Sequence, residues 1–180
     1  MKKPFFAWMN FTRMHFKTHV RPSMINRAGM PGNYYADGML EMDDNVGKLT
    51  ALLDELKITD NTIVIFTTDN GPNQFSWPDA ATTPFRSEKN TNWEGAYRVP
   101  AFVRWPGHIK PGGLTNEIFS GLDWFPTLLA AAGNTTIAND LLKGANVGGK
   151  TFKVHLDGYN QLDFITGKTD KSFRKEFIYF

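Results

Sequence analysis

Apolar residues recur three or four positions apart through the segment 39–56. That spacing places them on one face of an α-helix, and the side chain of Asn33 can cap the first turn. The sequence therefore predicts a long helix that begins after Asn33 and ends before the turn at residues 59–61. The stripe consists of Met39, Met42, Val46, Leu49, Leu53 and Leu56.

Three runs of apolar, β-branched and aromatic residues predict strands. Residues 62–68 form an unbroken run, which suits a central strand that is covered on both faces. Residues 4–10 and 99–105 form the other two runs. A shorter helix is expected over residues 122–132, with Gly133 at its end. A helix followed by a buried strand is typical of layered α/β structure, so we expect an α/β fold.

A polar segment separates the first predicted strand from the long helix. Residues 11–32 contain two prolines and two glycines that interrupt regular structure, so the segment is predicted to be a long loop. Loops of this length inside a domain are often functional.

Composition narrows the class of protein. The chain has 180 residues, of which 41% are hydrophobic and 21% charged, as in a globular domain with a core. A formal net charge of +2 is too small to indicate binding to nucleic acid or to an acidic membrane surface. No apolar run approaches the length needed to cross a bilayer. The chain has no cysteine, which excludes disulfides and removes one candidate nucleophile.

Asp69 and Asn70 directly follow the strand predicted at residues 62–68. Ligands of α/β sheets bind beyond the carboxyl ends of the strands. A carboxylate and an amide offer hard oxygen ligands that suit calcium or magnesium, although calcium takes about six to eight oxygens. The run Asp69-Asn70-Gly71 is also good chemistry for a simple turn, so spacing alone leaves both interpretations open.

His15 and Lys89 are the other candidates for chemistry. A histidine in the loop after the first strand can donate a proton or hold an anion, but it can equally be a surface residue. Lys89 lies in an irregular polar segment, where a solvated lysine is the ordinary case. Neither residue alone indicates a site.

Five blocks of the sequence occur in an order that resembles the type I sulfatases, or arylsulfatases. The most recognisable block is Thr67-Thr68-Asp69-Asn70-Gly71-Pro72 at the end of a strand. The order of the blocks is more specific than any one of them. The blocks are residues 4–15, with His15; 35–47; 61–72; 89–107, with Lys89; and 123–133.

This resemblance implies the fold of the alkaline phosphatase superfamily. In that α/β sandwich, helices enclose a mixed, largely parallel central sheet. Residues 1–133 would form the C-terminal half of the domain. Residues 134–180 would form its end and the lead-in to a smaller C-terminal domain. The chain is therefore expected to be an internal piece of a longer enzyme.

The resemblance also implies an activity, the hydrolysis of sulfuric esters. A divalent cation, Ca²⁺ or alternatively Mg²⁺, would be held in part by Asp69 and Asn70. Lys89 would contact the sulfate, and His15 would contact it or protonate the leaving oxygen, so both are expected to be catalytic and substrate-binding residues. The expected substrate is a small-molecule or carbohydrate sulfate ester. Many family members are exported, which favours a periplasmic or secreted location.

The family's nucleophile is a formylglycine made from the first residue of a Cys/Ser-x-Pro-x-Arg motif, and the 180 residues contain no such motif. Ser23 lacks the proline, and Ser76 is followed by Pro78 but has Ala80 where arginine is required. Two alternatives therefore stay open: a non-catalytic, truncated sulfatase-like protein, or a phosphatase or phosphonate hydrolase of the same superfamily. A working sulfatase predicts the missing motif in frame in the DNA upstream of Met1.

We predict that the isolated 180-residue chain hydrolyses no aryl sulfate, because the motif that supplies the family's formylglycine nucleophile is absent from it. The assay uses purified, calcium-loaded chain and a chromogenic aryl sulfate, with a sulfatase that carries the motif as the positive control. Turnover by the isolated chain would contradict the prediction.

Overall fold

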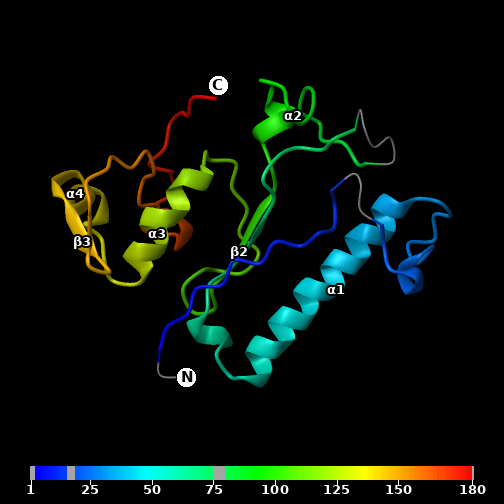
Figure 1. Ribbon diagram of the computed structural model, residues 1–180, viewed down its shortest axis with the longest axis horizontal. Coiled ribbons are helices and arrows are strands. Elements are labelled where there is room, and N and C mark those ends of the chain that lie inside the picture. The colour runs from blue at the N-terminus through cyan, green and yellow to red at the C-terminus, as the bar shows by residue number, and fades with distance from the viewer. Residues whose placement is uncertain (1–2, 16–18, 75–79, 180) are drawn as a thin grey trace. The chain divides into compact units, whose positions relative to one another are not determined.

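The computed structural model describes residues 3–15, 19–74 and 80–179. The chain forms two compact units, unit 1 with Met1–Val103 and unit 2 with Arg104–Phe180 (Figure 1). Within the described ranges, no helix combines the length and the apolar character that a membrane-spanning segment needs. Each unit is described by itself below.

Helix α1, Tyr34–Glu55, is the longest element of unit 1 and confirms the helix expected from the apolar spacing. The Asn33 side chain accepts a hydrogen bond from the Ala36 N–H at 2.8 Å, as predicted for its cap. The chain leaves the helix at Lys57, which has a left-handed φ of 55°. The N–H groups of Lys57 and Ile58 donate back to carbonyls of the last turn, which satisfies the end of the helix.

The two faces of α1 are buried to different degrees. The predicted apolar stripe is at most half-buried, and Met39 is 41% exposed. Asp37 and Glu41, on the opposite face, are only 1% and 3% exposed. Arg13, Asn26 and Ala28 of the preceding loop bond to the carboxylates on that face. The apolar spacing therefore identified the helix but not its most buried face.

Strands β1, Val64–Thr67, and β2, Ala101–Arg104, pair in a two-stranded sheet. Both strands lie inside the runs that predicted them, so they are confirmed as strands. The prediction that residues 62–68 form a central strand covered on both faces is not, because β1 pairs with β2 alone among the described strands and none of its residues is fully buried. At the last residue of β1, the Thr67 hydroxyl donates to the Pro100 carbonyl, just before β2, at 3.0 Å. The sheet therefore leads directly into the segment that follows Thr67.

Residues 4–10 form no strand, so the third strand prediction is wrong for this structure. A strand needs a neighbour for its N–H and C=O groups, and these residues pair with no other strand of the described chain. Their large side chains remain in water, with Phe6 and Trp8 exposed by 74% and 79%. The apolar run has the composition of a strand, but no strand of the described chain pairs with it.

Three shorter elements occur in the described part of unit 1. The 3₁₀ turn η1 lies in the predicted long loop, and η2 coincides with the predicted turn after α1. Helix α2 lies in the irregular segment between the two strands. Their bounds are η1, Pro22–Met24; η2, Thr59–Asn61; and α2, Glu94–Tyr97.

In unit 2 the turn η3, Gly121–Asp123, leads directly into helix α3, Trp124–Ala131. Together they confirm the helix predicted over residues 122–132. Gly133 follows with φ of 97°, the left-handed conformation that glycine readily adopts at helix ends. Its predicted place at the end of the helix is therefore confirmed.

The rest of unit 2 contains a hairpin between two short helices. The strands β3 and β4 are antiparallel, and Gly148 and Gly149 connect them with φ of 58° and 81°. Two consecutive left-handed residues suit the tight two-residue turn of a hairpin, which explains the pair of glycines. The elements are α4, Ile137–Lys143; β3, Ala145–Val147; β4, Lys150–Phe152; and α5, Leu162–Ile165.

The centre of unit 2 is polar rather than apolar. Asp123, at the start of α3, is completely buried and accepts two hydrogen bonds from Arg174, from Nη2 to Oδ1 at 2.7 Å and from Nε to Oδ2 at 2.9 Å. The N–H groups of Tyr159 and Ser120 donate to the same carboxylate at 2.8 and 3.0 Å. One carboxylate therefore joins three segments of unit 2, the turn η3 and the stretches around Tyr159 and Arg174.

Gln161 extends this network. Its N–H donates to the Thr127 hydroxyl at 2.9 Å, and its side-chain amide donates to the Ser172 hydroxyl at 2.8 Å and accepts from the Phe173 N–H at 2.9 Å. Throughout the described residues, every buried side-chain nitrogen and oxygen has a hydrogen-bond partner. A fully satisfied buried network specifies one arrangement of the segments that it joins.

The pKa of Asp123 reflects two opposing effects. Burial raises it, but the Arg174 guanidinium and the N–H groups of Tyr159 and Ser120 outweigh burial, so the pKa lies below its ordinary value. Since the pKa is lower in the folded than in the unfolded chain, the ionised carboxylate stabilises the fold at neutral pH. This stability is fully present above the unfolded pKa and is lost as the pH falls through the folded pKa.

We predict that Asp123→Asn lowers the free energy of unfolding by about 3 kcal/mol at pH 7, because it leaves a buried arginine without its counter-ion. The parent chain should also lose more stability than the variant between pH 7 and pH 3. Urea unfolding followed by circular dichroism measures both effects. Asp163→Asn, which removes an exposed pair with Lys168, is the matched control and should change stability little. Equal stability of Asp123→Asn and the parent at pH 7 would contradict the prediction.

Candidate functional site

The candidate site begins where β1 ends. Asp69 and Asn70 follow the strand, Asp69 exposed and Asn70 half-buried, and the chain then turns at Gly71. The Asn70 side-chain nitrogen donates to the Gly71 carbonyl at 2.8 Å, which directs the amide oxygen away from that carbonyl. A carboxylate and an amide oxygen are thus adjacent at the carboxyl end of a strand.

Two glycines allow a second segment to lie against this turn. The Gly71 N–H donates to the Ala96 carbonyl at 2.7 Å, and a Cβ on Gly71 would lie 1.7 Å from the Gly95 carbonyl oxygen. The Gly95 N–H donates to the backbone carbonyl of Arg86 at 2.7 Å, and a Cβ on Gly95 would lie 1.9 Å from the Ser87 carbonyl oxygen. No side chain larger than hydrogen fits at either position, so the three stretches of backbone approach closely only because both residues are glycine.

This close approach brings Lys89 beside the turn after β1. The Lys89 N–H donates to the Pro72 carbonyl at 2.9 Å. Ser87 and Asn90 have left-handed φ of 65° and 67°, so the chain turns sharply on both sides of Lys89. Left-handed residues other than glycine cost free energy and cluster at functional sites. The structure therefore brings together three of the four predicted site residues.

Two cation–π contacts shape the segment around Lys89. The Arg86 guanidinium lies 3.7 Å from the centre of the Trp93 ring, and the Arg98 guanidinium lies 4.1 Å from the centre of the Phe85 ring. Stacking of this kind orients a guanidinium while leaving its charge in place. The two arginines therefore have a packing role in this segment.

The donor atoms of Asp69 and Asn70 are suited to a hard cation, because Ca²⁺ and Mg²⁺ prefer carboxylate and amide oxygens. Calcium takes about six to eight oxygens, and two side chains provide far fewer. Across residues 3–15, 19–74 and 80–179, no group of three His, Cys, Asp or Glu side chains could hold a metal ion. The pair fits the chemistry of a calcium site and would provide only part of its ligands.

His15 lies exposed on the loop that leads toward α1, and the contacts that hold Lys89 do not involve it. Two residues earlier, Arg13 donates two hydrogen bonds to the buried carboxylate of Glu41 on α1. Sequence analysis missed this anchor. Its signal was the spacing of Asp37, Glu41 and Asp44, which places three acids on one helix face, next to a loop that contains three arginines.

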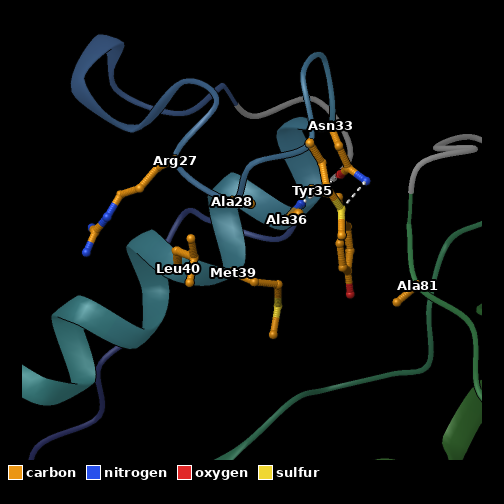
Figure 2. Close-up of a pocket in the computed structure, with 9 residues that line it drawn as sticks. Arg27, Ala28, Asn33, Tyr35, Ala36, Met39, Leu40 and Ala81 are labelled. Carbon is orange, nitrogen blue, oxygen red and sulfur yellow. Dashed lines mark hydrogen bonds between the residues drawn. The ribbon is translucent and has the colours of Figure 1, made fainter.

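A hollow of about 670 Å³ lies against the N-terminal half of α1. Figure 2 shows the side chains of Tyr35 and Met39 extending from the helix on the side where Ala81 lies. Arg27, the charged residue of the lining, already pairs with Asp44. The hollow therefore suits an apolar group better than a charged one.

Asp69 and Asn70 thus lie at the carboxyl end of a strand, the place where α/β proteins bind their ligands, and the backbone of Lys89 bonds to the turn that follows them. Comparison with known proteins agrees with this class. A sequence model of the sulfatase family matches residues 2–134. Human N-acetylgalactosamine-6-sulfatase is 34% identical over 146 residues, which are 80% of this chain and 28% of that protein.

Solved structures give the same result. The crystal structure of the PsFucS1 sulfatase from Pseudoalteromonas sp. matches with a TM-score of 0.74 and 33% identity, covering 89% of this chain and 30% of that chain. The crystal structure of Ps i-CgsB in complex with k-i-k-neocarrahexaose matches with a TM-score of 0.61 and 32% identity, covering 76% of this chain and 27% of that chain.

The chain belongs to the sulfatase family. Its fold is part of an alkaline-phosphatase-like α/β domain, which confirms the fold class expected from the sequence. The chain spans less than a third of the length of the relatives described above.

We predict that Gly71→Ala lowers the free energy of unfolding by about 1 to 3 kcal/mol, because its Cβ would overlap the Gly95 carbonyl oxygen. Gly47→Ala is the matched control. It lies within α1 with no atom within 4 Å of the added Cβ, and should raise stability by up to about 1 kcal/mol through helix propensity. Urea unfolding of both variants and the parent measures the two shifts. A Gly71→Ala variant as stable as the parent would refute the close approach.

Proposed function

We propose that the chain carries the cation- and sulfate-binding part of a sulfuric ester hydrolase. In the whole enzyme, residues 1–133 belong to the C-terminal half of the α/β domain. Residues 134–180 form its end and the lead-in to a smaller domain. Membership of the sulfatase family supports the reaction class. The local structure of unit 1 supports the particular residues.

One observation carries the assignment of the site: backbone bonds fix the Lys89 segment to the turn that bears Asp69 and Asn70. The Lys89 N–H donates to the Pro72 carbonyl at 2.9 Å. The Gly71 N–H donates to the Ala96 carbonyl at 2.7 Å. A simple turn and a solvated loop would not require close approach between two glycines. The arrangement is better explained by a lysine that must stay beside an aspartate–asparagine pair.

Each side chain suits one part of the reaction. Cleavage of a sulfate ester places negative charge on the leaving oxygen and on the sulfate oxygens, and preorganised positive charge stabilises that state. Lys89 contributes its ammonium group to the sulfate oxygens. His15 binds the sulfate or donates a proton to the leaving oxygen. Asp69 and Asn70 are two ligands of a Ca²⁺ or Mg²⁺ ion, which when bound supplies a Lewis acid.

The proposed substrate is a sulfate ester of a carbohydrate or of another small molecule. Two relatives support this class. N-acetylgalactosamine-6-sulfatase is named for a sugar sulfate, and the structure of Ps i-CgsB contains k-i-k-neocarrahexaose. These names concern the relatives, and the substrate of the enzyme that contains this chain is inferred from them.

The group that attacks sulfur has no precursor among the 180 residues. In the family it is a formylglycine, which supplies the nucleophile. Ser23 lies exposed in η1 and lacks the required motif, whereas Ser76 and Pro78 lie outside the described residues. The proposal therefore assigns binding and charge stabilisation, but not attack, to this chain.

The missing motif also supports a second candidate, a sulfatase-like protein that binds an anion without turnover. The two candidates predict different behaviour of the whole protein toward a sulfate ester. A formylglycine-bearing enzyme releases sulfate from an ester, whereas a binding protein leaves the ester intact. Release of sulfate from an aryl sulfate by the whole protein decides between them.

We predict that Lys89→Ala and His15→Ala each lower kcat of the whole enzyme severely, by about 10² to 10⁴ for a histidine that acts as general acid. Steady-state kinetics with a chromogenic aryl sulfate measure the losses. Lys48→Ala, at an exposed position of α1, and His155→Ala, at an exposed position of unit 2, are the controls and should keep the parent kcat. An unchanged kcat for either site variant would refute the role of that residue.

A further inference from the structure

Three carboxylates on one face of α1 hold the loop that precedes the helix. Asp37, Glu41 and Asp44 are four and three residues apart, which places them on the same face. Asp37 accepts hydrogen bonds from the N–H groups of Asn26 and Ala28, at 2.7 and 2.8 Å. Asp44 pairs with an arginine in the same stretch of loop. These two acids therefore anchor the half of the loop that is closer to the helix.

Glu41 bonds to the half of the loop that contains His15. Arg13 donates from Nε to Oε2 at 2.7 Å and from Nη2 to Oε1 at 3.1 Å, a bidentate pair. Arg21 adds an ion pair, with Nε 2.6 Å from Oε1, and its backbone N–H donates to Oε2 at 3.4 Å. The bonds from Arg13 in particular hold the pKa of Glu41 below its ordinary value, so the carboxylate stays ionised.

The path from Glu41 to His15 is short. Arg13 is followed by Met14, whose left-handed φ of 74° turns the chain just before the histidine. The Met14 sulfur lies against the helix at Gly38, where an added Cβ would be 3.5 Å away. Arg13 and Met14 are thus both fixed to α1, so the backbone that enters His15 has little freedom.

We propose that Glu41 is a positioning residue, which acts through Arg13 to hold His15 where it can serve the sulfate ester. The inference rests on the proposed function of His15. Glu41 itself does not touch the substrate. Its side chain is buried, and its oxygens are occupied by Arg13 and Arg21. Displacement of a catalytic group by about 1 Å can cost about 100-fold in rate, so a buried anchor two residues away can control turnover.

The test compares kcat in the whole enzyme for the parent, Glu41→Gln, His15→Ala and the double variant, with an aryl sulfate as substrate. Glu41→Gln should lower kcat about 10- to 100-fold and change KM less. In the His15→Ala background, Glu41→Gln should lower kcat no further, because its effect passes through the missing imidazole. Glu55→Gln, the same substitution at an exposed position of α1, should match the parent.

Arg13→Gln provides a second route to the same test. It leaves Glu41 paired with Arg21, so the buried carboxylate keeps an ionic partner and folding is less disturbed. This variant should show the same loss of kcat and the same absence of any further loss in the His15→Ala background. Thermal unfolding of each variant checks that the comparison is between folded proteins.

Two results would overturn the inference. The first is an unchanged kcat in both Glu41→Gln and Arg13→Gln. The second is a further loss in the His15→Ala background, which would show that Glu41 only stabilises the fold. If His15→Ala itself keeps the parent kcat, the proposed role of the histidine fails, and the inference about Glu41 fails with it. The single His15→Ala measurement therefore separates failure of the proposed function from failure of the positioning role alone.

Discussion

A carboxylate that leaves water must keep charged or hydrogen-bonded partners, and this requirement organises both units of the chain. In unit 2, Asp123 joins three segments through Arg174 and two backbone N–H groups. In unit 1, Glu41 binds two arginines of the preceding loop. The buried hydrophobic residues of the described chain are few, and half of them are alanine. Polar pairs with fixed geometry, more than apolar area, therefore specify how these segments are arranged.

The candidate site depends instead on the close approach of two stretches of backbone, the turn after β1 and the segment that contains Lys89. Gly71 and Gly95 remove the side chains that would keep the turn after β1 away from the segment of Lys89. The hydrogen bonds that result are between backbone groups, so they fix the two segments without using any side chain. The Asp69 carboxylate, the Asn70 amide oxygen and the Lys89 ammonium take no part in these backbone bonds. Backbone that is fixed in this way holds the three residues near one another before a ligand binds, which favours preorganised binding.

Local patterns allowed much of the fold to be predicted, because they depend on neighbours in the sequence. The periodicity of α1, the apolar runs of β1 and β2, and the glycine after α3 were all recognisable. The strand predicted at residues 4–10 does not form in this structure, because a strand also requires a partner, and the sequence pattern does not show whether one is present. The Glu41 anchor was missed for a related reason. Its meaning depends on arginines that are 20 and 28 residues away in the sequence, and no local rule joins them.

The exposed N-terminal segment has a practical consequence for work with this protein. Phe5, Phe6, Trp8 and Met9 are all largely open to water in a stretch with the composition of a strand. Such a stretch can pair with the same stretch of another molecule, because its N–H and C=O groups lack strand partners in the described structure. The purified chain should therefore self-associate through this segment as its concentration rises. A charged residue in place of Phe6 would oppose that aggregation without touching the cation- or sulfate-binding residues.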